Sequence, residues 1–420
     1  MYIITFSLNG YKNRLPYQSN MSLFTDNNQV EVQTNEEEMT FNSWDDEEVI
    51  PLKTNLLRGI YAYGFENPSP IQKKAIIPLI KRRDVIAQAQ SGTGKTGAFV
   101  VGSLQILDEK LDEAQILVLA HTRELARQIF SVVAALGNQM GMRHQLLVGG
   151  TSTEEDREKL ERNRPQIIIG CPGRVHDMIR RKYLSTKKIS LMVLDEADEL
   201  LSHGFKDQIY KIFQFMNNDI QIGLFSATMP AELNTLTTKF LRHPVKILIK
   251  KEMLTLQGIQ QFFVNLENDE HKYTTLKDLF GTLSVSQAII YCNSIRRVDD
   301  LYEAMKHDEF PVERLHGSLD ESERKAIYET FKSGGCRVLI ATDLIARGID
   351  IQQVSIVINF DIPKNVHTYL HRIGRSGRWG RKGVGINFIT RRDVQKMKEI
   401  EEFYSTQVKE FPVNYKDLIR

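Results

Sequence analysis

The stretch Asp84–Phe99, DVIAQAQSGTGKTGAF, joins three successive features of the chain. Asp84–Ala87 is a short apolar run typical of a buried strand, a glycine-rich loop follows it, and an apolar helical segment begins at Gly97. The loop Ala89–Thr96 has the Walker-A spacing, with Ala89 in the place of the first glycine. Backbone N–H groups of such a loop and the N-terminus of the next helix are suited to bind phosphate. A glycine-rich turn with a chance Gly-Lys-Thr is the alternative, and the strand–loop–helix context argues against it.

The polar side chains of this loop predict a nucleotide site with a metal ion. Lys95 is expected to neutralise the outer phosphates, and Thr96 is expected to ligate Mg²⁺. The loop residues predicted to bind the nucleotide are Ser91, Gly92, Thr93, Gly94, Lys95 and Thr96.

The acidic tetrad Asp195-Glu196-Ala197-Asp198 directly follows the apolar run Leu191–Leu194, as a Walker-B segment does. Asp195 is predicted to hold the Mg²⁺, and Glu196 is predicted to position and deprotonate the attacking water. Acidic residues at a helix N-terminus also favour the helix dipole, which is the alternative. The pairing with a Walker-A loop favours the catalytic interpretation, in which Lys95, Asp195 and Glu196 act together.

Short apolar runs recur along the chain at intervals of roughly 20–40 residues, which is typical of buried parallel strands linked by helices. They form two series, so the sequence predicts an α/β fold with two doubly wound parallel-sheet domains. The first series is Asp84–Ala87, Ile116–Leu119, Ile167–Ile169, Leu191–Leu194 and Ile222–Phe225. The second is Ala288–Tyr291, Val312–Leu315, Val338–Ile340, Ile356–Ile358 and Ile386–Ile389. Ligands of such sheets bind beyond the carboxyl ends of the strands.

We predict four segments from these patterns. Residues 1–40 are polar, acidic and without sustained periodicity, so they are expected to be a disordered tail. Residues 41–249 are the predicted first domain and residues 259–420 the second, and the charged stretch 250–258 is the predicted linker between them.

Composition narrows the class of protein. The 420 residues are 41% hydrophobic and 26% charged, and no apolar run is long enough to span a membrane. The net charge of +2 divides into −7 over residues 1–48 and +9 over the remainder, a balance that suits a polyanionic partner. Cys171, Cys292 and Cys336 lack CxxC spacing, which argues against a disulfide framework or a zinc site and favours an intracellular protein.

With these motifs in place, the chain resembles the DEAD-box RNA helicases, whose signature is Asp-Glu-Ala-Asp after a strand. The resemblance extends from about residue 41 to the end and is strongest to the subfamily of eukaryotic translation initiation factor 4A. It implies two RecA-like domains joined by a short linker, with ATP and Mg²⁺ as cofactors. The stretches that carry the closer match are Leu56–Phe65, Gly204–Tyr210, Lys250–Glu252 and Val413–Asn414.

The resemblance extends the nucleotide site to other parts of the chain. Gly64–Gln72 resembles the motif that reads adenine, with Phe65 and Gln72 as binding residues. An aromatic residue upstream is expected to stack on the base, and Trp44 is preferred to Phe41. An ordinary aromatic residue, exposed at the surface or buried in the core, is the alternative for either ring. Gly348 and Asp350 match positions that face the nucleotide.

Two further motifs imply a site shared by both domains. In His371–Arg378, Arg375 and Arg378 match the arginine fingers that stabilise charge on the γ-phosphate. A basic loop that faces RNA is the alternative for this segment. Ser226, Thr228 and His371 match residues that couple the acidic tetrad to domain closure.

The resemblance also implies an RNA site that reads phosphates and 2′-hydroxyls rather than base sequence. Each of these residues taken alone fits an ordinary surface or turn, and their order along the chain favours RNA. The predicted contacts are Thr122, Arg123, Gly150, Pro172, Gly173, Arg174, Ser294, Arg324 and Thr342.

The chain departs from the family pattern at two of these motifs. His121 stands where the family has proline, and Cys171 stands where it has threonine. Cysteine is a poorer donor to phosphate than threonine, so we expect modestly weaker or retuned RNA binding with an intact ATPase centre. For His121, titration against phosphate is one interpretation, and a benign substitution is preferred.

Together these features predict an RNA-dependent ATPase that locally unwinds short RNA duplexes or remodels RNA–protein complexes, as ATP and RNA cooperatively close the two domains. The alternative is an ATP-gated RNA clamp with slow turnover, and a DNA helicase or another RecA-type motor is disfavoured. The expected partners are single-stranded RNA or a short RNA duplex, bound without sequence preference, and protein activators or scaffolds. We expect a monomer that does not enter membranes, in the cytoplasm rather than the nucleus.

Overall fold

The computed structural model describes residues 40–89, 92–202, 204–248, 259–282, 287–343, 354–376 and 383–412. Several predictions lie outside these residues. They are the tail up to residue 39, the linker at 250–258, and the site residues Ser91, Gly348, Asp350 and Arg378.

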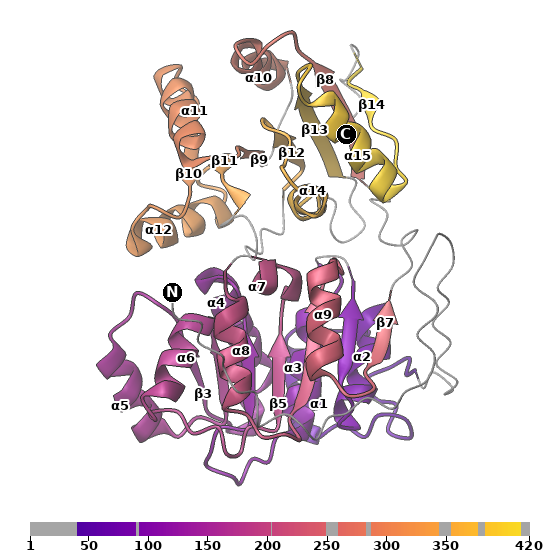
Figure 1. Ribbon diagram of the computed structural model, residues 1–420, viewed down its shortest axis with the longest axis vertical. Coiled ribbons are helices and arrows are strands. Elements are labelled where there is room, and N and C mark those ends of the chain that lie inside the picture. The colour runs from indigo at the N-terminus through magenta and orange to yellow at the C-terminus, as the bar shows by residue number, and fades with distance from the viewer. Residues whose placement is uncertain are drawn as a thin grey trace, which may run out of the picture. The chain divides into compact units, whose positions relative to one another are not determined.

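The first half of the chain builds one seven-stranded sheet in which every pairing is parallel (Figure 1). The strand order is β3-β4-β2-β5-β6-β1-β7. The strands are β1 (Val85–Gln88), β2 (Ile116–Leu119), β3 (His144–Leu147), β4 (Ile167–Gly170), β5 (Leu191–Leu194), β6 (Gln221–Ser226) and β7 (Val245–Leu248).

The second half builds another parallel seven-stranded sheet, in the order β10-β11-β9-β12-β13-β8-β14. If the strands of each sheet are numbered from its own first strand, both sheets read 3-4-2-5-6-1-7, so the two halves share one topology. The strands are β8 (Ile259–Asn265), β9 (Ala288–Tyr291), β10 (Val312–Leu315), β11 (Val338–Ala341), β12 (Ile356–Asn359), β13 (Gly383–Ile389) and β14 (Lys409–Glu410).

Helices connect the strands and cover the faces of the sheets. The helices of the first half are α1 (Thr54–Ala62), α2 (Pro70–Ile80), α3 (Lys95–Ile106), α4 (Arg123–Leu136), η1 (Asn138–Met140), α5 (Thr153–Asn163), α6 (Pro172–Arg180), α7 (Ala197–Ser202), α8 (Lys206–Gln214) and α9 (Ala231–Phe240). Those of the second half are α10 (His271–Thr282), α11 (Ile295–His307), α12 (Glu321–Lys332), α14 (Val366–Ile373) and α15 (Val394–Tyr404).

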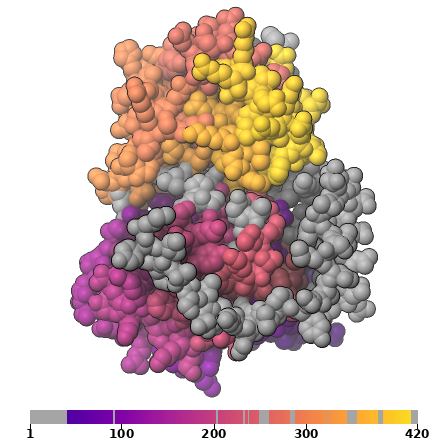
Figure 2. All heavy atoms as spheres, viewed as in Figure 1, coloured from indigo at the N-terminus to yellow at the C-terminus, as the bar shows by residue number. Residues whose placement is uncertain are grey.

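Each sheet separates two hydrophobic clusters, because successive strand residues point to opposite faces. On β2, Ile116 and Val118 belong to one cluster while Leu117 and Leu119 belong to the other. The second sheet is sandwiched in the same way. The clusters of the first sheet contain residues of the first half alone, and those of the second sheet contain residues of the second half alone, so each half packs its own core. On the face shown in Figure 2 the colours of the two halves do not intermix.

Buried Asp84 fastens the start of β1 to its neighbours. Its Oδ1 accepts a hydrogen bond from Ile222 N at 2.8 Å, and its Oδ2 accepts one from Arg242 N at 2.7 Å. A buried carboxylate is stable only when such donors surround it. This residue therefore fixes β6 and the chain entering β7 on either side of the strand that leads into the glycine-rich loop.

The predicted fold class is confirmed, and all ten predicted strands are present. The sequence did not predict β3, β7, β8 and β14. β3 is an edge strand whose residues alternate between half-buried and buried, so it lacks a continuous apolar run. β8 contains Gln260 and Gln261 and is half-exposed along much of its length, and β14 has only two residues. Across the described residues, none of the helices combines the length and apolar character needed to cross a membrane.

Candidate nucleotide and RNA sites

The glycine-rich loop lies between β1 and α3, and its backbone requires glycine. Gly92 and Gly94 have φ values of 81° and 100°, in the left-handed region that other residues rarely adopt. A Cβ on Gly94 would lie 2.7 Å from Ser69 Oγ and 3.0 Å from Gln72 Nε2. The loop therefore packs its bare backbone against the start of α2 and leaves α3 to begin at Lys95, an arrangement that fits a phosphate cradle.

The predicted adenine-reading motif lies against this loop. Gln72 Nε2 donates to Gly94 O at 3.3 Å, while its Oε1 accepts a hydrogen bond from Ser69 N at 2.7 Å. Phe65 approaches Gly97 so closely that a Cβ there would be 2.8 Å from the ring. The structure thus brings Gln72 and Phe65 together with the loop, although Gln72 is 22 residues from its partner Gly94 and Phe65 lies further upstream.

The upstream aromatic residues are both in the core. Trp44 is 1% exposed and Phe41 is 0% exposed. The two rings lie 5.6 Å apart, and Trp44 is stacked on Phe65 at 6.4 Å. A place in the core was one of the two alternatives to base stacking, and in this structure neither ring presents an open face. Stacking of Trp44 on a base stays a prediction.

Lys95 and Asp195 are buried near each other at the carboxyl ends of β1 and β5. Lys95 Nζ donates to Ala89 O at 2.5 Å, and Ala89 N in turn donates to Ser226 O at the end of β6. Burial and the neighbouring Glu196 raise the pKa of Asp195 to about 7, although Lys95 acts in the opposite direction. A bound cation would stabilise the charged form of this buried carboxylate. The site therefore suits the metal ion that Asp195 and Thr96 are predicted to ligate.

Glu196 has the most unusual backbone of the acidic tetrad, with φ of 48° in the left-handed region. Such strain is concentrated at functional sites. Its Oε2 lies 3.2 Å from His121 Nδ1, and its Oε1 lies 4.0 Å from Arg375 of the second half. Burial alone would raise the pKa of Glu196, yet the pKa is lowered because His121, His371 and Arg375 surround the carboxylate.

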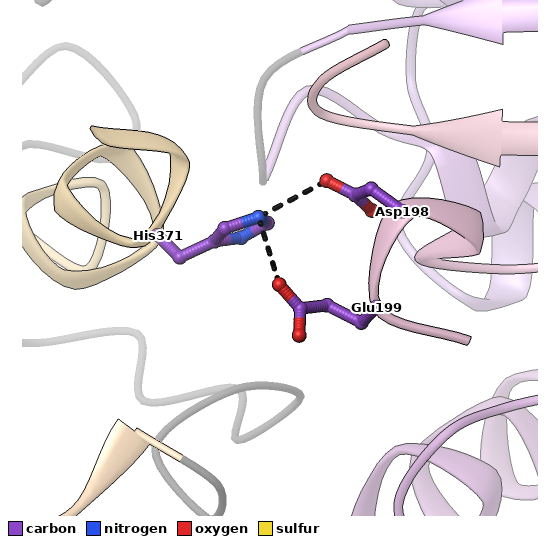
Figure 3. Close-up of side chains that lie close together, drawn as sticks. All are labelled: Asp198, Glu199 and His371. Carbon is purple, nitrogen blue, oxygen red and sulfur yellow. Dashed lines mark hydrogen bonds and ion pairs between the residues drawn. The ribbon is translucent and has the colours of Figure 1, made fainter. Parts of the chain in front are cut away.

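Asp198 joins the two halves of the chain. Its Oδ2 accepts a hydrogen bond from Thr228 Oγ1 at 2.5 Å and lies 3.2 Å from His371 Nε2, while Glu199 Oε1 is 3.8 Å from the same nitrogen (Figure 3). Burial opposes ionisation, but the hydrogen bonds from His371 and Thr228 lower the pKa of Asp198. Ser226 Oγ donates to Thr228 O at 2.6 Å. The three predicted coupling residues, Ser226, Thr228 and His371, therefore meet at one carboxylate.

The strand order separates the predicted sites of the first half. The nucleotide loop follows β1, the acidic tetrad follows β5, and Ser226 ends β6; these three strands are neighbours in the sheet. The predicted RNA contacts of this half follow β2, β3 and β4, which are also neighbours. Because the carboxyl ends of parallel strands share one edge, the two sets lie side by side along it.

The first RNA-contact residues are held by local hydrogen bonds. Thr122 is the N-cap of α4, and its Oγ1 accepts a hydrogen bond from Leu125 N at 3.2 Å. Arg123 runs past Gly149, where a Cβ would be 3.2 Å from its guanidinium. Gly150 is exposed in the next position. The segments after β2 and β3 are thus brought together.

Arg174 forms hydrogen bonds and an ion pair with the segment that follows β3. Its guanidinium donates to Thr151 Oγ1 at 2.8 Å and to Thr151 O at 2.7 Å, and it pairs with buried Asp156. Pro172 is buried at the first position of α6, and Gly173 is exposed beside it. The preceding Cys171 is the N-cap residue of α6 and makes no capping hydrogen bond.

The predicted RNA contacts of the second half follow the topologically equivalent strands β9, β10 and β11. Ser294 caps α11, where its Oγ accepts a hydrogen bond from Arg297 N at 3.3 Å. Thr342 follows β11 and donates its N–H to Leu315 O. Arg324 on α12 lies 3.5 Å from Glu124 of the first half. The six segments therefore occupy matching places in the two sheets.

Arg372 is an organising residue that sequence reasoning missed. It is 1% exposed and donates to Asp343, Asn359 Oδ1, Asp361 O and Asn293 Oδ1. These bonds tie α14 to the segments that follow β9, β11 and β12. Arg372 thereby fixes the helix that carries His371 and Arg375. Arg372 lies between His371 and Arg375 in the same basic motif. The sequence therefore did not show whether its side chain is buried against protein oxygens or binds phosphate.

Comparison with known proteins shows the family of the chain. Residues 69–236 match the DEAD/DEAH box helicase model, and residues 271–380 match the helicase conserved C-terminal domain. The chain is 53% identical to "ATP-dependent RNA helicase eIF4A" of Neurospora crassa over 93% of this chain and 97% of that protein.

Two solved structures have the same fold. S. cerevisiae Dbp5 bound to RNA and ADP BeF3 is 34% identical, with a TM-score of 0.82, over 89% of this chain and 97% of that one. Mss116p bound to ssRNA and AMP-PNP is 27% identical, with a TM-score of 0.78, over 86% of this chain and 78% of that one. Both halves are thus RecA-like, and the chain belongs to the DEAD-box family of ATP-dependent RNA helicases, within the eIF4A subfamily.

Proposed function

We propose that the chain is an RNA-dependent ATPase that locally unwinds short RNA duplexes or remodels RNA–protein complexes, and that ATP and RNA cooperatively close its two domains. The observation that carries this proposal is that the acidic tetrad contacts both halves of the chain. Arg375 lies 4.0 Å from Glu196, and His371 lies 3.2 Å from Asp198. If the second half completes the nucleotide site, ATP favours the closed arrangement of the two halves. RNA that contacts both halves favours the same arrangement, so the two ligands bind cooperatively.

In the first half, Gly92–Thr96 and Lys95 hold the phosphates of ATP, and Gln72 reads the adenine through its paired donor and acceptor. Thr96 and Asp195 hold Mg²⁺, which when bound neutralises charge on the phosphates. Glu196 orients the attacking water and accepts its proton at a carboxylate oxygen. Arg375 and Arg378 stabilise the charge that develops on the γ-phosphate.

RNA binding uses the segments after β2, β3 and β4 and their equivalents after β9, β10 and β11. Hydroxyls, glycine backbone and arginines suit phosphates and 2′-hydroxyls, so we propose single-stranded RNA or a short duplex, bound without sequence preference. A bent strand is enough to open a short helix, since a base-pair step in DNA is worth only ~1.4 kcal/mol. The RNA present in the Dbp5 and Mss116p structures supports this partner.

Strand separation and ATP-dependent RNA retention test the proposal together. We expect a short RNA duplex to separate at a rate that rises with ATP, and RNA to be released after hydrolysis. Lasting retention of RNA with ATP and no strand separation would favour the alternative of an ATP-gated clamp with slow turnover. We further propose a monomer that works with protein activators or scaffolds in the cytoplasm rather than the nucleus.

Replacing Thr228 with valine tests the coupling at Asp198. The substitution keeps the shape of the side chain and removes the 2.5 Å hydrogen bond to Asp198 Oδ2. We expect ATPase activity to persist within about threefold while duplex separation falls by about tenfold, because the buried contact to His371 loses its support. Parallel ATPase and strand-separation assays measure the two effects, and an equal loss in both would contradict a coupling role.

Replacing Cys171 with threonine is expected to tighten RNA binding. Burial raises the pKa of the Cys171 thiol to about 12, so the group stays neutral, and it makes no capping bond to α6. Threonine supplies a hydroxyl donor for phosphate and a preferred N-cap, which stabilises a helix by about 1 kcal/mol. We expect a dissociation constant for RNA that is lower by about threefold, with kcat unchanged at saturating RNA. Fluorescence anisotropy with labelled RNA measures it, and weaker binding would contradict the account.

A further inference from the structure

His121 lies at the boundary between the two groups of strands described above. It follows the end of β2 by two residues, and Glu196 follows the end of β5 by two residues. β2 and β5 are neighbouring parallel strands in which Leu119 and Leu194 are register partners. Asp195 N donates to Leu119 O at 3.0 Å, which holds the two strand ends together. The sheet itself therefore brings the side chains of His121 and Glu196 to one place.

The contact between the two side chains is buried. His121 Nδ1 lies 3.2 Å from Glu196 Oε2, and the side chains are 3% and 9% exposed. Nearly all water is excluded from this contact, so the imidazole nitrogen and the carboxylate oxygen face each other in a medium of low dielectric constant. Arg375 approaches the other oxygen, Oε1, at 4.0 Å. Each oxygen of Glu196 thus has its own neighbour, one from the same sheet and one from the second half.

A neighbour of this kind restricts the positions that a catalytic carboxylate occupies. The left-handed backbone of Glu196 does not by itself fix where the side chain points. A misplacement of about 1 Å in a reacting group can cost as much as about 10²-fold in rate. Proline, which this position carries in the family pattern, offers no side-chain nitrogen to the carboxylate, whereas histidine does.

We propose that His121 is a positioning residue for Glu196, and that it joins this carboxylate to the segment that binds RNA. This inference rests on the proposed function, in which Glu196 is the base. The residue after His121, Thr122, caps α4, and Arg123 packs against Gly149 after β3. A displacement of this segment by RNA moves the backbone that carries His121, and the contact passes the displacement to Glu196.

Three substitutions of His121 test the contact atom by atom. The amide nitrogen of asparagine falls near the position of Nδ1, whereas that of glutamine falls near Nε2. We expect His121→Ala and His121→Gln to lower the RNA-stimulated kcat by about tenfold, with the KM for ATP within about twofold of the parent. His121→Asn is expected to recover most of the rate. His307→Asn is the matched control, because that side chain is 89% exposed on α11, and its kcat should equal that of the parent.

A double-substitution cycle shows whether His121 acts through Glu196. In a Glu196→Gln background, His121→Ala should leave the residual ATPase rate unchanged within about twofold, because the group that it positions is already gone. If the two residues acted independently, the losses in rate from the two substitutions would multiply in the double variant. Thermal unfolding midpoints of all variants show whether a lost rate reflects lost fold.

The outcomes separate this inference from the function on which it rests. If Glu196→Gln abolishes hydrolysis while folded His121→Ala keeps the parental kcat, the inference is wrong and the proposed function stands. A loss in His121→Ala that asparagine does not restore, or that multiplies with the loss from Glu196→Gln, also overturns it. A parent chain that does not hydrolyse ATP would overturn both.

Discussion

Replacing Glu196 with glutamine is expected to lower kcat for ATP hydrolysis by about 10³-fold, within the range of a lost general base. Glutamine has nearly the same shape but cannot accept the proton of the attacking water. The left-handed backbone at this position is no worse for glutamine than for glutamate. The fold and the phosphate cradle should therefore persist.

ATP binding is expected to survive this change or to improve. Glu196 lies beside Asp195, whose pKa it helps to raise, so removal of its charge relieves repulsion in the same site. The variant should bind ATP at least as tightly as the parent and should retain RNA in its presence. Steady-state ATPase assays and nucleotide fluorescence measure the two properties. Hydrolysis at the parental rate would show that another group is the base.

Replacing Arg375 with alanine removes the guanidinium that the second half places beside Glu196. Its guanidinium is buried, donates to His371 O, and lies 4.0 Å from Glu196 Oε1. An arginine that stabilises charge on a transferred phosphoryl group is worth about 10³–10⁵ in rate. We expect kcat to fall by about 10³-fold, while nucleotide binding to the first half changes little.

Arg375→Lys separates geometry from charge. Lysine keeps the positive charge but lacks the planar fork of donors, so it should recover less than about a tenth of the rate. Lys396→Ala on α15 is the control, because that side chain is partly exposed and pairs with Glu399 on its own helix. ATPase rates at saturating ATP and RNA compare the three variants. A normal rate in Arg375→Ala would mean that the second half does not complete the site.

Strands that lie inside a sheet were predictable because both faces are buried, which demands a continuous apolar run. Ile116–Leu119 and Leu191–Leu194 are examples, and each is present with the predicted bounds. Edge strands lack such a run and were not predicted. β3 is buried at only every second residue, and β14 consists of only two residues. Hydrophobic runs alone also do not specify the order of strands in a sheet, so the identical order in the two halves was not predicted.

The candidate site was predictable where a motif is contiguous. Lys95, Asp195 and Glu196 were identified from local patterns, and the structure brings Gln72, Phe65 and the glycine-rich loop together. Contacts that depend on strand pairing were beyond the sequence. His121 was interpreted as a benign substitution, yet β2 and β5 place it 3.2 Å from Glu196.

The contacts of the arginine side chains were also not predictable from the sequence. Sequence reasoning assigned Arg174 to RNA, which stays a prediction, and it did not foresee that the guanidinium contacts Thr151 and Asp156. Arg372 was passed over, although it holds α14 in place through four partners. A guanidinium serves phosphates and protein oxygens equally well, so its neighbours decide its role, and those neighbours come from distant parts of the chain.

The dependence of ATP hydrolysis on RNA is measured with three samples. ATPase rates of the full chain are measured alone, with single-stranded RNA, and with single-stranded DNA of the same sequence. Recognition through 2′-hydroxyls predicts that RNA raises the rate by about tenfold or more and that DNA leaves it near the basal value. Equal stimulation by RNA and DNA, or none by either, would contradict the account.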